Sequence, residues 1–144
     1  MFDPRRLDDT ISVAPQIAPD DLPAVEAAGF VAVINNRPDG EEPGQPGGAA
    51  IRAAAEAAGL AYHAIPVGGG MTAQQLAATA AVLAGAGGPV LAYCRSGTRS
   101  CHLWALSAAQ GGAEPAAIAA KAAAAGYDLT GLQALLDHLF ASPR

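Results

Sequence analysis

The residues best suited to chemistry lie in one short stretch, LAYCRSGTRSCHLWAL, which covers residues 91–106. An apolar run ends at Cys94, and a turn around Gly97 follows, with Arg95 before the glycine and Arg99 after it. A cysteine thiolate is a nucleophile, and a guanidinium group can bind an anion through two parallel hydrogen bonds. A cysteine at the end of a buried strand is often only a small core residue, but that alternative leaves the arginines and the glycine unexplained. The pattern therefore predicts a reaction of Cys94 with an anionic substrate.

The residues between Cys94 and Arg99 have the composition of an anion-binding turn. The backbone N–H groups of such a turn point inward, and the helix that we expect to begin near Arg99 adds the partial positive charge of its N-terminus. Gly97 permits a backbone conformation that other residues resist. We therefore predict that Cys94 and Arg99 are the catalytic residues. The predicted anion-binding residues are Arg95, Ser96, Gly97, Thr98 and Ser100.

Patterns typical of strands and helices alternate along the chain. The expected strands cover residues 11–17, 30–36, 60–66 and 89–94, and the expected helices cover residues 18–29, 49–59, 73–88, 99–110, 115–125 and 129–140. This alternation predicts an α/β fold of three layers, in which helices cover both faces of a mostly parallel four-stranded sheet. No long linker interrupts it, so we expect a single domain over residues 1–144. Ligands of such sheets bind beyond the carboxyl ends of the strands, which is where Cys94 falls.

Composition excludes several classes of function. The chain has 8 Lys and Arg against 13 Asp and Glu, and its basic residues are scattered apart from those next to Cys94, which argues against a nucleic-acid surface. No apolar stretch is long enough for a membrane span, and the N-terminus does not have the pattern of a signal peptide, so we expect a cytoplasmic protein. The two cysteines and the three histidines show no metal-ligand spacing, and we expect neither a metal nor a cofactor. The oligomeric state stays open.

The chain as a whole resembles a known family. The resemblance rests on APDDLPAVEAAGFVAVINNRPDGEE, AAGLAYHAIPV, GPVLAYCRSGTRS and LWAL, and CRSGTRS is its most specific part. These segments resemble the beta-lactamase hydrolase-like phosphatase domain family and, more broadly, the compact dual-specificity members of the protein-tyrosine-phosphatase superfamily. The resemblance covers nearly the whole chain. It implies cysteine-dependent group transfer through a covalent intermediate on Cys94, with the anion held by the loop amides and Arg99.

Two features depart from the phosphatase pattern. Phosphatases of this fold have five residues between the cysteine and the arginine, and this chain has four, which removes about 3.5 Å of chain from the loop. The spacing is similar to the active-site loop of rhodanese-type sulfurtransferases, which have a different fold. Such phosphatases also carry an upstream acid, but no Asp or Glu occurs between Glu56 and Glu114. The candidate acids are Asp39, Glu41 and Glu42, for which a solvated loop is the alternative.

The chemistry of the leaving group decides between the two functions. An alkoxide or phenolate leaves poorly without a proton, and general acid catalysis contributes about 10²–10⁴ in rate. Sulfite or a thiolate is already a stable anion. We therefore predict a sulfurtransferase that moves sulfane sulfur from a small anionic donor, thiosulfate or a low-molecular-weight persulfide, through a persulfide on Cys94 to a thiol acceptor. The alternatives are a phosphatase that forms a phosphocysteine, and an anion-binding module without turnover.

Neighbouring residues leave further alternatives open. Tyr93 stands where many phosphatases have a histidine. Cys101 could resolve an oxidised Cys94, or it could be a buried cysteine of a helix. Arg37 follows an expected strand at the same edge of the sheet and could help to attract an anion.

Overall fold

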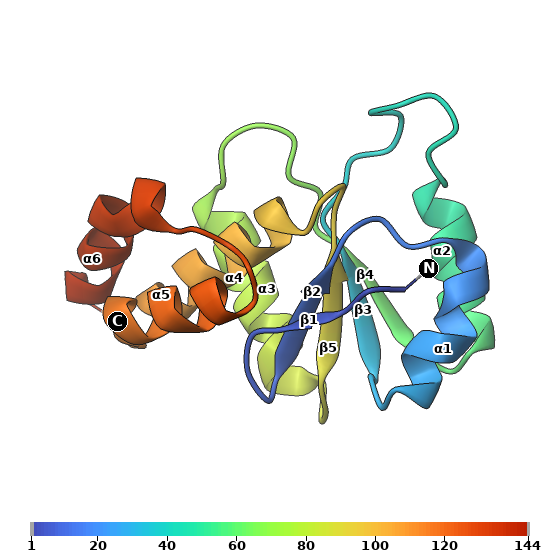
Figure 1. The fold of residues 1–144 in the computed structure, drawn as a ribbon, viewed down its shortest axis with the longest axis horizontal. Helices are drawn as coiled ribbons and strands as arrows, with labels where there is room; N and C mark the ends of the chain where they lie inside the picture. The colour runs from blue at the N-terminus through green and yellow to red at the C-terminus, as the bar shows by residue number, and fades with distance from the viewer. Residues whose placement is uncertain (1, 144) are drawn as a thin grey trace.

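The computed structural model describes residues 2–143, and its centre is a five-stranded sheet (Figure 1). The strands are β1 Arg5–Arg6, β2 Ile11–Ala14, β3 Ala32–Asn35, β4 Ala61–Ala64 and β5 Val90–Tyr93. Their order is β1-β2-β5-β3-β4; β2, β5, β3 and β4 run parallel, and β1 pairs antiparallel with β2. The prediction of four strands was wrong, because the sheet has a fifth strand, β1. Two charged residues at a sheet edge show no alternation of apolar and polar residues, so the sequence carried no signal for this strand.

Eight helical segments connect and follow the strands. They are η1 Pro19–Asp21, α1 Leu22–Ala27, α2 Gly48–Ala57, α3 Ala73–Gly85, α4 Thr98–Gln110, α5 Pro115–Ala124, η2 Thr130–Leu132 and α6 Gln133–Ala141. Each lies within a region where the sequence predicted a helix, except that α2 and α4 begin one residue earlier and α6 ends one residue later. Two predicted helices are each a 3-10 turn followed by a shorter α-helix, η1 with α1 and η2 with α6.

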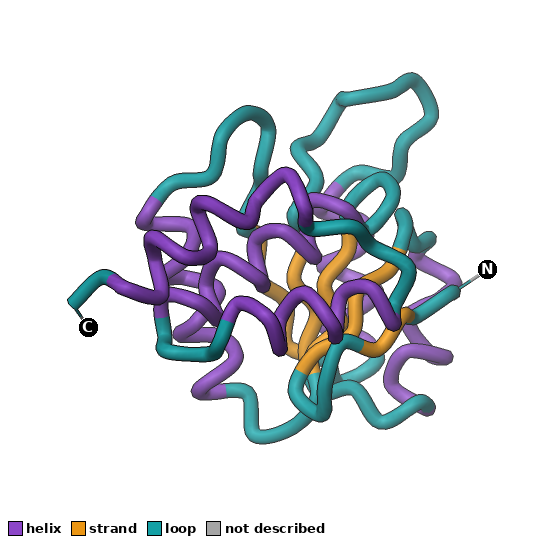
Figure 2. The backbone as a smooth tube through the Cα atoms, turned by 60° about the vertical axis from the view of Figure 1, so that its left-hand side comes forward, coloured by secondary structure: helices purple, strands orange, loops and turns teal. Residues whose placement is uncertain are grey.

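Helices cover both faces of the sheet, as the sequence predicts (Figures 1 and 2). The side chains of β5 alternate between the two faces: Leu91 and Tyr93 lie in the core beneath α1 and α2, and Val90 and Ala92 lie in the larger core beneath α3 and α4. Helices α5 and α6 pack against α4 and form the outer part of that side. All four side chains of β5 are buried, which agrees with its central place in the sheet.

The carboxyl ends of the parallel strands meet at one end of the molecule. Asn35 of β3 and Ala14 of β2 both pair with Tyr93, so these three strands end level with one another. Four connections lie at this end: residues 15–18, residues 36–47, residues 65–72, and the turn 94–97 between β5 and α4 (Figure 1). Segments far apart in the sequence therefore surround Cys94. Within residues 2–143, no helix has the length and apolar character needed to cross a membrane.

Candidate active site

Cys94 is the first residue after β5, and its side chain is fully buried. The backbone N–H of Gly97 donates a hydrogen bond to its Sγ atom at 3.1 Å. An N–H group that points at the sulfur stabilises negative charge on it, and the N-terminus of α4 at Thr98 adds to the same field. The predicted nucleophile therefore lies inside a turn of the predicted kind.

Gly97 is required by the backbone and by its surroundings. It precedes the first residue of α4 with a φ of 90°, in the left-handed region that residues with a Cβ resist. A Cβ atom at this position would lie 2.2 Å from the hydroxyl oxygen of Tyr127. Another residue here would move either the turn or the tyrosine.

Tyr127 supports the turn from the segment between α5 and η2. Its hydroxyl donates to the carbonyl oxygen of Ser96 at 3.1 Å and accepts from Nη1 of Arg5 at 2.9 Å. The guanidinium of Arg5 also lies over the tyrosine ring, 5.5 Å from its centroid. Neither residue was predicted from the sequence, because neither belongs to a motif and only the fold brings Tyr127 to Ser96 and Arg5 to Tyr127.

Arg99 does not point into open solvent. Its two terminal nitrogens donate to the two carboxylate oxygens of Glu41 at 2.7 and 2.8 Å, and Nη1 also donates to the carbonyl oxygen of Val67 at 2.7 Å. The hydrogen bonds to Glu41 raise the pKa of Arg99, to which the sulfur of Cys94 also contributes. The guanidinium thus lies near Cys94, and the carboxylate of Glu41 already occupies its two terminal donors.

Arg37 also donates a hydrogen bond to Glu41 and belongs to the same network. Its side chain is only 5% exposed, and its Nε donates to Glu41 at 2.9 Å. Its two terminal nitrogens donate to Gln16 and to Glu42, each at 3.0 Å. Arg99 first and Arg37 second lower the pKa of Glu41 to about 2. Glu41 is therefore ionised at neutral pH in this arrangement and has no proton to give.

Arg95 completes a group of five charged residues over the turn. Its side chain is 69% exposed, and its Nε lies 2.7 Å from a carboxylate oxygen of Glu42. We call these residues the ion-pair cluster; they are Arg37, Glu41, Glu42, Arg95 and Arg99. The cluster joins the connection 36–47 to the turn after Cys94, and with three arginines and two glutamates it keeps one formal positive charge.

The remaining predicted anion-binding residues, Ser96, Thr98 and Ser100, make hydrogen bonds within the protein. The hydroxyl of Ser96 donates to Oγ1 of Thr98 at 3.0 Å and accepts from its backbone N–H at 3.3 Å. Ser100 is buried, and its hydroxyl donates to Oδ1 of Asn36 at 2.7 Å, while the amide of Asn36 donates to the carbonyl of Ile65. Ser100 thus ties α4 to the ends of β3 and β4, a role that the sequence did not indicate.

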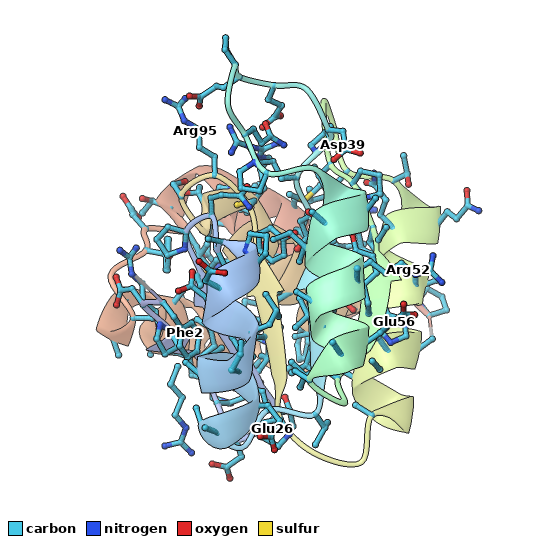
Figure 3. All side chains as sticks on the ribbon, turned by 90° about the vertical axis from the view of Figure 1, so that its right-hand side faces the viewer. Phe2, Glu26, Asp39, Arg52, Glu56 and Arg95 are labelled. Carbon is cyan, nitrogen blue, oxygen red and sulfur yellow. The ribbon has the colours of Figure 1, made fainter. Side chains whose placement is uncertain are left out.

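Of the three candidate acids, Asp39 is not a member of the ion-pair cluster. Its Oδ1 accepts a hydrogen bond from the backbone N–H of Gly48 at 2.8 Å, at the N-terminus of α2. Figure 3 shows Asp39 and Arg95 at the same end of the molecule, with Glu26 at the opposite end. Asp39 therefore caps a helix next to the site.

Cys101 is a buried residue of α4, packed in the core beneath that helix. Burial, and secondarily the nearby Cys94, raises its pKa to about 12. Its thiol is therefore protonated at neutral pH, which favours the packing alternative over a resolving role. Burial also raises the pKa of Tyr93, so the side chain before Cys94 stays neutral. Among residues 2–143, no group of three or more histidine, cysteine and acidic side chains is placed to hold a metal ion.

Comparisons with known proteins agree with this architecture. Residues 3–111 match the family described as beta-lactamase hydrolase-like protein, phosphatase-like domain. The Beta-lactamase hydrolase-like protein of Agrobacterium fabrum strain C58 is 44% identical over 108 residues, which are 74% of this chain and 25% of that protein. The chain thus spans about a quarter of the length of this curated relative.

Solved structures show the same fold. A candidate phosphatase of Neisseria meningitidis Z2491 is 34% identical with a TM-score of 0.82, and the match covers 93% of this chain and 96% of that one. PTPMT1 is 17% identical with a TM-score of 0.73, covers 95% and 93% of the two chains, and shows the fold alone. The family resemblance and the protein-tyrosine-phosphatase-like fold are confirmed. The names of these proteins favour the phosphatase alternative over the predicted sulfurtransferase, and none bears on the rhodanese-like spacing.

Proposed function

Because this chain belongs to the beta-lactamase hydrolase-like protein, phosphatase-like domain family, we propose that it is an enzyme that transfers a group through a covalent intermediate on Cys94. The group that the geometry of the site supports best is a sulfane sulfur atom. A phosphoryl group is the second candidate, favoured by the family and by the phosphatases among its structural neighbours.

One observation carries the choice of sulfur: the carboxylate in contact with Arg99 is itself bound by two arginines and is not placed as a proton donor. Glu41 is the carboxyl group nearest to this chemistry by its contacts with Arg99, and its pKa of about 2 leaves it ionised. A departing alkoxide or phenolate requires a proton, whereas a departing thiolate or sulfite does not. The site is therefore suited to a leaving group that is stable as an anion.

The proposed reaction has two steps, and each step transfers the terminal sulfur atom from one sulfur atom to another. The Cys94 thiolate attacks the terminal sulfur of a persulfide R–S–S–H; the S–S bond breaks, R–S⁻ leaves with the bonding electrons, and Cys94 carries the –S–S–H group. An acceptor thiolate attacks the same terminal sulfur, and the Cys94 thiolate is regenerated. Thiosulfate reacts in the same way, with sulfite as the leaving group. No external oxidant or reductant is consumed. The N–H of Gly97 stabilises the Cys94 sulfur each time that it carries negative charge.

The second candidate uses the same nucleophile with a different leaving group. Attack of Cys94 on a phosphate monoester breaks the P–O bond to the leaving alcohol, and water then releases phosphate from the phosphocysteine. This pathway requires a proton donor that Glu41 cannot supply while it is bound to Arg99 and Arg37. Asp39 would have to leave the N-terminus of α2 to serve instead.

The two candidates are separated by trapping the intermediate. The protein is incubated with a low-molecular-weight persulfide or with thiosulfate, and the peptide that contains Cys94 is analysed by mass spectrometry. We expect this peptide to gain the mass of one sulfur atom, and we expect no gain in Cys94→Ser. An unmodified Cys94 after exposure to both donors, in protein that hydrolyses an aryl phosphate, would decide for the phosphatase.

A further inference from the structure

The ion-pair cluster leaves the predicted anion site occupied by a side chain of the protein itself. Both terminal nitrogens of Arg99 donate to the carboxylate of Glu41, and one of them also donates to Val67. Bidentate binding of a phosphate or sulfonate group uses the same pair of donors. An oxyanion and the carboxylate of Glu41 therefore compete for one guanidinium.

Arg37 cannot replace Arg99 as an anion receptor. All three of its side-chain nitrogens donate to protein atoms, of Gln16, Glu41 and Glu42, and the side chain is almost fully buried. Arg95 is exposed, but its Nε is paired with Glu42. Each arginine of the cluster thus has a carboxylate partner, and an oxyanion that binds both terminal nitrogens of Arg99 must displace Glu41 from them.

The segment that carries Glu41 is held in place. Oε1 of Gln45 accepts the backbone N–H groups of Glu41 and Glu42 at 3.1 and 3.3 Å, and its amide donates to the carbonyl of Pro38 at 2.9 Å. When Glu41 is displaced from Arg99, the carboxylate of Glu41 keeps a partner, because Nε of Arg37 also donates to it. The pair can therefore open without leaving the carboxylate of Glu41 unpaired.

From these contacts we propose that Glu41 is a specificity-determining residue. Because Glu41 binds the terminal nitrogens of Arg99, the enzyme prefers persulfides to donors with an oxyanion group. This inference rests on the proposed function. The sulfur atoms of a persulfide carry no oxyanion group and do not compete with Glu41 for the donors of Arg99. The sulfonate group of thiosulfate and the phosphoryl group of a phosphate monoester do compete with Glu41 for these donors. The substrate class of the site is thus the persulfide of a small thiol.

The test compares Glu41→Gln with a matched control, Glu56→Gln. Glu56 pairs with Arg52 on the exposed surface of α2, so both variants remove one carboxylate from an ion pair with arginine (Figure 3). Sulfate binding is measured by calorimetry, and Cys94 persulfide formation is followed with a glutathione persulfide donor and with thiosulfate. We expect Glu41→Gln to bind sulfate about fivefold more tightly and to raise the kcat/KM for thiosulfate by a similar factor, since the upper end of the range for ion pairs corresponds to about that much. The kcat/KM for the persulfide should change less than about twofold, as should all three quantities in Glu56→Gln.

The possible results separate this inference from the proposed function. If persulfide forms on Cys94 but Glu41→Gln leaves the sulfate affinity and the donor ratio at their wild-type values, the role of Glu41 is wrong and the sulfurtransferase stands. If neither donor modifies Cys94, the proposed function fails, while the sulfate titration still shows whether Glu41 competes for Arg99. Loss of aryl phosphate hydrolysis in Glu41→Gln would overturn the inference and identify Glu41 as a proton donor. Should Glu41→Gln fail to fold, Glu41→Asp, which is too short for the same bidentate contact, must show the tighter sulfate binding.

Discussion

The turn at Cys94 can be tested through the contact between Gly97 and Tyr127. In Gly97→Ala, the new residue must adopt a φ near 90°, which costs about 1–2 kcal/mol for a residue with a Cβ. Its Cβ would also lie 2.2 Å from the Tyr127 hydroxyl, so the tyrosine must move and give up its hydrogen bond to Ser96. Loss of that bond adds about 1 kcal/mol, and we expect the free energy of unfolding to fall by about 2–3 kcal/mol in total.

A double-mutant cycle separates the two contributions. Tyr127→Phe removes the hydroxyl that the new Cβ meets and the hydrogen bond to Ser96, and alone it should cost about 1 kcal/mol. In the double variant that hydrogen bond is lost only once, so the combined cost should be about 1 kcal/mol less than the sum of the single costs.

Urea unfolding followed by the fluorescence of Trp104, the single tryptophan of the chain and a buried residue, measures all four proteins of the cycle. Gly97→Ala should also slow the reaction of Cys94, because the N–H that donates to Sγ moves with the turn. If the two costs add to within about 0.5 kcal/mol, Tyr127 does not limit the residue at position 97, and the argument for its supporting role fails.

Three further predictions concern the charged residues and the second cysteine. Arg99→Lys keeps the charge but loses the planar pair of donors, so sulfate affinity should fall about tenfold with an unchanged far-ultraviolet circular dichroism spectrum; wild-type affinity in calorimetry would remove Arg99 from the anion site. The pKa of Glu41 is lowered from 4.5 to about 2, so its ion pairs stabilise the fold fully above about pH 5, and this contribution is lost as the pH falls from there toward 2. Unfolding free energies measured across that range should decline less steeply in Glu41→Gln than in the wild type, and parallel declines would contradict the assignment. In the wild type the buried thiol of Cys101 is protonated at neutral pH and is not a nucleophile, so Cys101→Ala should still form a persulfide on Cys94. Peptide mapping that finds the added sulfur on Cys101 of the wild-type protein would refute this.

The sequence was sufficient to predict the site where the chemistry is local. The apolar run before Cys94 and the alternation of strands with helices placed the cysteine at the carboxyl end of a central strand, and β5 has that position. The need for a glycine in the turn was also predictable, because its reason is partly a backbone conformation.

The contacts across the fold could not be predicted in the same way. Glu41 and Arg99 are 58 positions apart, and the sequence offered Glu41 only as one of three acids in a loop that also had a solvated alternative. Which acid meets the arginine depends on how the connection 36–47 is braced, here by Gln45. Tyr127 lies beyond the residues that match the family, and its contact with Ser96 arises from the packing of the C-terminal helices. The absence of a periodic pattern in two residues explains why β1 was missed.

We propose that Cys94 transfers sulfur rather than phosphoryl groups. The most direct test of this proposal is the ratio of kcat/KM for glutathione persulfide to kcat/KM for an aryl phosphate, measured on one preparation of the protein with Cys94→Ser as the control. Because Glu41 is ionised while Arg99 and Arg37 bind it, and a general acid contributes about 10²–10⁴ in rate to loss of a leaving group that needs a proton, the ratio should be at least about 10². A ratio below one, with both activities lost in Cys94→Ser, would contradict the account and make this protein a phosphatase.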